Sequence, residues 1–120
     1  MRALVIDDND QILDVLSFLL ESNNIEFKTV NNGKDALDLI FSSDPKDRYD
    51  IIFLDLAMPE MSGFQVVDQL YKKNALGDKK VVVITALELS AEDESSLLQK
   101  GITTILKKPF LVEDVEKILS

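Results

Sequence analysis

The chain has 120 residues, which at about 150 residues per domain argues for one compact domain spanning residues 1–120. Apolar residues make up 46% and charged residues 29%, as in globular proteins, and 22 acidic against 13 basic residues give a formal charge of −9. This negative charge argues against nucleic acid or an anionic membrane as the main partner. The chain has no Cys and no His, which excludes disulfides, Cys/His zinc sites, and thiol or Ser-His nucleophiles.

The first third of the chain alternates predicted strands with predicted helices. Residues 3–6 are continuously apolar, which is typical of a strand covered on both faces. Behind Asp10, the expected N-cap, apolar residues recur at helical spacing and predict a core-facing stripe. Residues 25–30 predict a mixed strand that suits a sheet edge, and residues 34–41 a second helix after the turn Asn31-Asn32-Gly33. The stripe consists of Ile12, Leu13, Leu16, Leu19 and Leu20.

The same alternation continues to the end of the chain. Residues 42–49 are interpreted as a surface loop, and residues 51–54 and 81–84 are two more continuously apolar strands. Residues 102–106 include two threonines, which favours a second edge strand, and Gly101 before them is an expected helix C-cap. The three remaining predicted helices are 64–71, 91–100 and 112–119.

Five strands alternating with five helices predict the α/β class, with a parallel sheet, right-handed crossovers and helices on both faces. With the second and fifth strands at the edges, the simplest doubly wound order is 2-1-3-4-5. This is the order of flavodoxin-like folds, so the prediction rests partly on analogy.

The ends of the parallel strands meet at one edge of the sheet, and the chemistry-bearing residues follow those ends. They are Asp7 and Asp8, Asp55, Thr85 and Lys108. Three neighbouring carboxylates repel one another, so a positive charge must accompany them, and an oxygen-only cluster suits Mg²⁺. With a metal ion and the Lys108 ammonium present, an Asp carboxylate can attack a phosphoryl group whose oxygen then bonds to Thr85.

Five landmarks in this order together resemble the receiver domain of two-component response regulators, a chemotaxis-regulator-like module, over nearly the whole chain. Any one of them alone would be a weak signal. The landmarks are Asp7-Asp8, Asn32-Gly33 before Ala36-Leu37, the run from Asp50 through Asp55 and Met58-Pro59 to Gly63, Thr85-Ala86, and Lys108-Pro109-Phe110 with Gly101 seven residues before Lys108.

The resemblance implies a metal site and a phosphoryl site that share one carboxylate. Asp55 is the implied phosphoacceptor and a magnesium ligand, Asp8 a direct ligand, Asp7 an acidic partner acting largely through water, and the Ala57 carbonyl a further ligand. Such a chain is a signalling protein and not an enzyme in the ordinary sense, because it catalyses only its own aspartyl phosphorylation and dephosphorylation.

The phosphoryl group is implied to contact Thr85 and Lys108. Lys108 is chosen over the adjacent Lys107, a solvated neighbour, because the family's functional lysine directly precedes a proline, across a bond that is often cis there. The donor is then a histidine kinase or a histidine phosphotransfer protein. The resemblance also implies an unidentified output protein, with the helix 91–100, the strand 102–106 and the helix 112–119 as the candidate surface for it.

The chain departs from the family pattern at three positions. Ile105 stands three residues before the lysine, where many receivers carry an aromatic side chain that turns inward. Ala57 and Leu87, two residues past Asp55 and Thr85, are apolar where the family tunes dephosphorylation with polar groups. We therefore expect a long-lived aspartyl phosphate.

Three other functions are considered. A receiver-like adaptor that is never phosphorylated is the main alternative, although no site residue is missing. A phosphatase of the haloacid dehalogenase type would need a second Asp where Ala57 stands. A flavodoxin-like cofactor domain would need phosphate donors after the first strand, where residues 7–10 carry three carboxylates that repel phosphate.

The acidic residues Glu88, Glu92, Asp93 and Glu94 predict a solvated helix face or, alternatively, a docking patch, whereas Leu97 and Leu98 are expected in the core. No apolar run reaches the ~18 to 20 residues of a membrane span, and the N-terminus lacks a signal-peptide pattern, so a cytoplasmic location is expected. The initial Met1 and the end of the chain at the last helix suit a stand-alone protein.

Overall fold

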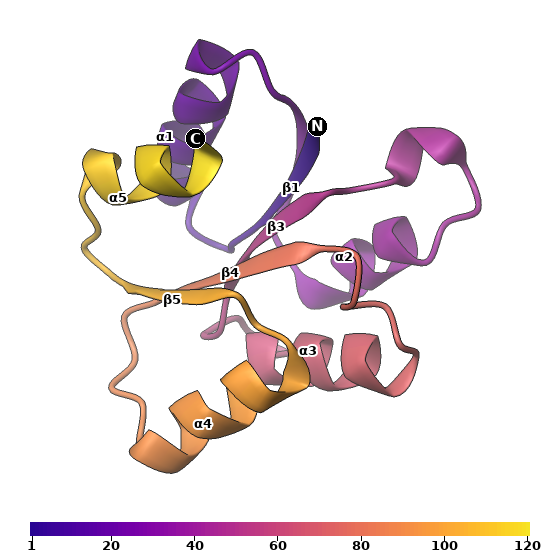
Figure 1. Ribbon diagram of the computed structural model, residues 1–120, viewed down its shortest axis with the longest axis vertical. Coiled ribbons are helices and arrows are strands. Elements are labelled where there is room, and N and C mark those ends of the chain that lie inside the picture. The colour runs from indigo at the N-terminus through magenta and orange to yellow at the C-terminus, as the bar shows by residue number, and fades with distance from the viewer.

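A computed structural model describes residues 1–120, in which five strands and five α-helices alternate along the chain (Figure 1). The strands form one parallel sheet in the order β2-β1-β3-β4-β5. This confirms the predicted doubly wound α/β class and the edge positions of β2 and β5. The strands are β1 (Arg2–Ile6), β2 (Glu26–Val30), β3 (Ile51–Asp55), β4 (Lys80–Thr85) and β5 (Thr104–Lys107).

Helices cover both faces of the sheet, with α1 and α5 on one face and α2, α3 and α4 on the other (Figure 1). Each face has its own apolar cluster because successive strand residues point to opposite sides. In β1, Leu4 and Ile6 pack toward α2 and α3, whereas Ala3 and Val5 pack toward α1 and α5. The helices are α1 (Asp10–Ser22), α2 (Gly33–Ile40), α3 (Gly63–Lys72), α4 (Ala91–Lys100) and α5 (Val112–Leu119).

The start of α1 differs from the prediction, because Asn9 and not Asp10 is the N-cap. Asn9 has an extended backbone, and its side-chain oxygen accepts hydrogen bonds from the backbone N–H groups of Gln11 and Ile12. Asp10 is the first helical residue, where its negative charge favours the positive end of the helix dipole. The predicted C-cap of α4 is confirmed, since Gly101 has a left-handed backbone with φ of 114°.

Two predictions about burial were wrong. The segment 42–49 is not entirely a surface loop, because Pro45–Asp47 forms a short 3₁₀ helix and Tyr49 is buried in the core, with its hydroxyl donating to Asp47. Leu98 is 52% exposed and not part of the core, because the inward face of α4 is occupied by Leu97. None of the helices combines the length and the apolar character needed to cross a membrane.

Gly63 lets α3 begin directly against the end of β3. Its backbone N–H donates to the Leu56 carbonyl over 2.9 Å, and a Cβ atom at this position would lie 2.2 Å from the carbonyl oxygen of Asp55. Any side chain here must therefore displace the backbone that carries Asp55, whereas a Cβ added at Gly77 would meet no atom within 4 Å.

We expect Gly63→Ala to lower the free energy of unfolding by about 1–3 kcal/mol, because the added methyl group overpacks a backbone contact that cannot relax cheaply. Gly77→Ala is the matched control and should change it by less than about 0.5 kcal/mol. Urea unfolding of the three proteins tests this, and equal stabilities for the two variants would contradict the contact.

Candidate functional site

The buried polar and charged residues of the chain all lie at one edge of the sheet. They are Asp7, Asp55 and Thr85, each no more than 3% exposed, and they stand at the carboxyl ends of β1, β3 and β4. Burial of carboxylates is costly unless they are paired or hydrogen-bonded. The structure therefore brings together the strand-end residues that the sequence had placed at this edge.

Lys108 supplies the positive charge at this edge. Its Nζ lies 2.9 Å from Oδ2 of Asp7 and 3.6 Å from Oδ1 of Asp55, so one ammonium faces two buried carboxylates. Its backbone N–H donates to the carbonyl of Thr85 over 2.8 Å, which fixes the start of the loop after β5 to the end of β4. The Lys108-Pro109 peptide bond is cis, as the family resemblance implies.

Asp8 completes a cluster of three carboxylates. Oxygen atoms of Asp7, Asp8 and Asp55 all lie within 4.8 Å of one another, and Asp8 is exposed whereas the other two are buried. The negative charge of the three carboxylates exceeds the positive charge of the single Lys108 ammonium. Mg²⁺ prefers hard oxygen ligands, and Asp8 leaves one side of the cluster open to solvent. These residues therefore fit a magnesium ion.

Local backbone hydrogen bonds orient the site side chains. The N–H of Asn9 donates to Oδ1 of Asp7 over 2.9 Å, and the N–H of Ala57 to Oδ1 of Asp55 over 3.2 Å. Asn9 was missed in the sequence analysis, although the preference for Asn at an N-cap was a usable signal. It links the start of α1 to the site, because the same residue caps the helix and donates to Asp7.

The environment of Asp55 favours its neutral form more than water does. Burial, followed by the repulsion of Asp7, raises the pKa of Asp55 to about 6, although the Ala57 N–H and Lys108 act in the opposite direction. In the absence of a further cation, the Asp55 carboxylate is thus destabilised near neutral pH.

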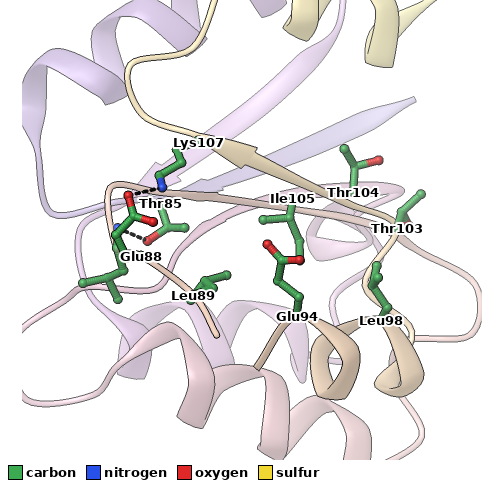
Figure 2. Close-up of a pocket in the computed structure, with 10 residues that line it drawn as sticks. Thr85, Glu88, Leu89, Glu94, Leu98, Thr103, Thr104, Ile105 and Lys107 are labelled. Atoms are coloured by element: carbon green, nitrogen blue, oxygen red, sulfur yellow. Dashed lines mark hydrogen bonds and ion pairs between the residues drawn. The ribbon is translucent and has the colours of Figure 1, made fainter. Parts of the chain in front are cut away.

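The two adjacent lysines have different surroundings. Lys107 forms an ion pair with Glu88 in the loop between β4 and α4 (Figure 2). Its side chain is 55% exposed, so the prediction of a solvated neighbour holds in part, but its ion pair with Glu88 was not predicted. Of the two, Lys108 alone reaches the buried carboxylates.

The family model of the response regulator receiver domain matches residues 3–120. The chain belongs to the response regulator receiver family. It is 33% identical to the response regulator MprA of Mycolicibacterium vanbaalenii, over 96% of this chain and 47% of MprA. It is also 33% identical to the hybrid signal transduction histidine kinase L of Dictyostelium discoideum, over 98% of this chain and 7% of that protein. The chain thus spans half or less of the length of these curated relatives.

Solved structures of receivers share the fold. The Vibrio cholerae chemotaxis protein CheY4 is 30% identical with a TM-score of 0.83, covering 98% of this chain and 94% of CheY4. A response regulator from Burkholderia pseudomallei, solved with a phosphorylated aspartic acid, a calcium ion and citrate, is 25% identical with a TM-score of 0.81 over 99% of this chain and 66% of that chain. This chain is accordingly a receiver domain of two-component signalling.

We expect Asp55→Asn to stabilise the metal-free protein by about 1–3 kcal/mol at pH 7.5, because it removes a buried carboxylate whose pKa is raised to about 6. At Asp55, wild type binds more protons when folded than when unfolded, so its free energy of unfolding rises as the pH falls through 6. The difference in free energy of unfolding between Asp55→Asn and wild type should therefore shrink toward pH 4. Urea unfolding in EDTA measures this.

The matched control is Asp78→Asn, which removes the same charge from a side chain that is 68% exposed. It should change stability by less than about 0.5 kcal/mol at either pH. If the difference in free energy of unfolding between Asp55→Asn and wild type stays constant from pH 7.5 to 4, burial does not penalise the ionised form of Asp55.

Proposed function

We propose that this receiver takes a phosphoryl group onto Asp55 from a histidine kinase or a histidine phosphotransfer protein and signals by phosphorylation-dependent binding of a partner. The observation that carries the proposal is the buried carboxylate of Asp55, 3.6 Å from Lys108 Nζ within the three-acid cluster. A nucleophile, a cation for the transferred group and ligands for a metal ion are thus in one place.

In the proposed reaction an Asp55 carboxylate oxygen attacks phosphorus. The P–O bond to Asp55 forms while the P–N bond to the donor imidazole breaks, and the imidazole nitrogen keeps the bonding electron pair. Magnesium, held by Asp8, Asp55 and the Ala57 carbonyl, with Asp7 acting largely through water, would supply neutralisation of the phosphoryl charge when bound. Lys108 neutralises that charge from the protein side.

The phosphoryl group carries about 1.5 to 2 negative charges, and the carboxylate that accepts it loses its own charge, so the end of β3 would gain about 0.5 to 1 net negative charge. Lys108 and the Thr85 hydroxyl are the groups proposed to bind the new phosphoryl oxygens. A signal requires that this binding selects a second conformation with a different affinity for a partner. Helix α4, strand β5 and helix α5 are the proposed surface for that partner.

The relatives support the same activity, since the Burkholderia pseudomallei protein was solved with a phosphorylated aspartic acid and a calcium ion. We propose a cytoplasmic location, and we propose that residues 1–120 form a single receiver domain that does not itself contact nucleic acid or a membrane. The competing function is an adaptor of the same fold that is never phosphorylated, and it is decided by the experiment that follows.

Incubation with a small acyl phosphate should add one phosphoryl group to wild type in the presence of magnesium, because Asp55 is ionised at pH 7.5 when its pKa is about 6. Intact-mass measurement should show no adduct for Asp55→Asn or for wild type in EDTA. No adduct on wild type with magnesium would favour the adaptor.

The adjacent lysines give this experiment an internal control. Lys108→Ala should slow formation of the adduct by about 10²-fold, since it removes the ammonium that faces the transferred group. Lys107→Ala removes an equal charge from an exposed pair and should change the rate by less than about twofold. Equal effects would exclude the proposed role of Lys108.

The adduct should decay over minutes or longer once the donor is removed, because Ala57 carries no polar side chain to orient an attacking water. Ala57→Asn should speed decay by about tenfold, and Ala57→Val, which adds bulk without a polar group, should not. Decay of wild type within seconds would contradict the expectation of a long-lived phosphate.

A further inference from the structure

Both oxygens of the buried Asp7 carboxylate accept a hydrogen bond, and the two donors come from distant parts of the chain. The backbone N–H of Asn9 donates to Oδ1, and Nζ of Lys108 donates to Oδ2, each over 2.9 Å. Asp7 is 2% exposed, so water cannot replace either donor at low cost. The orientation of this carboxylate is therefore set by Asn9 on one side and by Lys108 on the other.

Asn9 is itself held by the first turn of α1. Its backbone is extended, with φ of −94° and ψ of 113°, directly before the helix. Its side-chain oxygen accepts the N–H groups of Gln11 and Ile12 over 2.9 and 3.3 Å, and its carbonyl accepts those of Ile12 and Leu13 over 3.1 Å each. These bonds fix residue 9 in the conformation whose own N–H is directed at Asp7.

The cap of α1 and the bond to Asp7 depend on each other. Loss of the Asn9 side-chain oxygen removes the acceptor of two N–H groups in the first turn, which favours fraying of that turn. If residue 9 leaves its extended conformation, Oδ1 of Asp7 loses a donor in a place where an unsatisfied polar atom is costly. A break in one contact therefore weakens the other.

Among the three cluster carboxylates, Asp7 alone has a protein donor on each oxygen. Asp55 accepts only the N–H of Ala57, on Oδ1, and Asp8 is exposed to solvent. Asp7 is thus the fixed member of the cluster, and it holds the Lys108 ammonium in place. Hydrogen-bond partners that orient the groups around a metal ion commonly control the affinity for that ion.

We infer that Asn9 is a positioning residue of the site, which caps α1 and thereby holds the Asp7 carboxylate in the orientation that places Lys108 and favours Mg²⁺. The link to magnesium rests on the proposed function, whereas the orientation of Asp7 rests on hydrogen bonds of the protein alone. Linkage is reciprocal, so binding of Mg²⁺ stabilises the first turn of α1 in return.

Three variants separate this positioning role from ordinary helix capping. Asn9→Ala keeps the backbone N–H but removes the cap, and Asn9→Ser restores a side-chain oxygen that can cap. Asn32→Ala is the matched control, because Asn32 caps α2 by accepting the N–H of Asp35 over 2.8 Å and has no hydrogen bond to the acid cluster. Both alanine variants should lower the urea midpoint of unfolding by similar amounts, since each loses one N-cap.

Hydrogen exchange of the residue-9 amide, measured in EDTA, reports the bond to Asp7 without any metal ion. Asn9→Ala should lower the protection factor of this amide by about fivefold, the equilibrium equivalent of one N-cap, and Asn9→Ser should restore most of it. Asn32→Ala should leave the protection of residue 9 unchanged. Undiminished protection in Asn9→Ala, or an equal loss in Asn32→Ala, would overturn the inference.

An NMR titration with Mg²⁺ tests the consequence for the metal site. Asn9→Ala should raise the Kd for Mg²⁺ by about tenfold, as when a group that orients metal ligands is lost, whereas Asn9→Ser and Asn32→Ala should keep the wild-type Kd. An unchanged Kd in Asn9→Ala, or no recovery in Asn9→Ser, would defeat the positioning role and leave the proposed function. If wild type binds no Mg²⁺ while the residue-9 amide responds as expected, the proposed function fails and the orientation of Asp7 by Asn9 stands.

Discussion

The organisation of the site depends on one ammonium group placed between two buried carboxylates. Parallel strands β1 and β3 are neighbours, so Asp7 and Asp55 lie close together where the strands end, and both are largely shielded from water. Two such charges repel strongly in a medium of low dielectric constant, and Lys108 is the side chain that offsets them. With Asp8 added, negative charge still exceeds positive charge, and this excess favours the binding of a further cation.

The same edge of the sheet is connected by backbone hydrogen bonds to the surface proposed for partners. The N–H of Lys108 donates to the carbonyl of Thr85, and the N–H of Leu87, in the loop after β4, donates to the Thr85 hydroxyl. In the proposed function, a phosphoryl group on Asp55 would act first on Lys108, whose Nζ lies 3.6 Å from that carboxylate and whose backbone is hydrogen-bonded to Thr85. The proposed partner surface is therefore separated from the acid cluster by only a few hydrogen bonds.

The fold and the acid cluster were predictable because topology alone determines them: continuous apolar runs define the central strands, and all parallel strands end at one edge. The misassigned features depend on competition between neighbours or on distant contacts. The N-cap of α1 is Asn9 and not Asp10. Both residue types cap helices, and only the backbone angles show which of the two is the last residue before the helix. Tyr49 is buried by packing in a cluster whose other members are distant in sequence, and Leu98 is exposed because Leu97 occupies the inward face of α4. The Glu88–Lys107 pair joins two segments that no local pattern connects.

The position of Lys108 also explains how a buried carboxylate can remain reactive. Its Nζ is 2.9 Å from Asp7 but 3.6 Å from Asp55, so its full hydrogen bond goes to Asp7. Asp55 receives only the N–H of Ala57, at 3.2 Å, on Oδ1, which leaves its other oxygen without a donor from the protein. A full hydrogen bond from Lys108 to Asp55, like the one to Asp7, would stabilise the ionised Asp55 carboxylate and lower its pKa from about 6. A carboxylate stabilised in this way is a weaker nucleophile. The asymmetric placement of one cation therefore stabilises the buried pair and keeps an oxygen of the proposed phosphoacceptor free to attack.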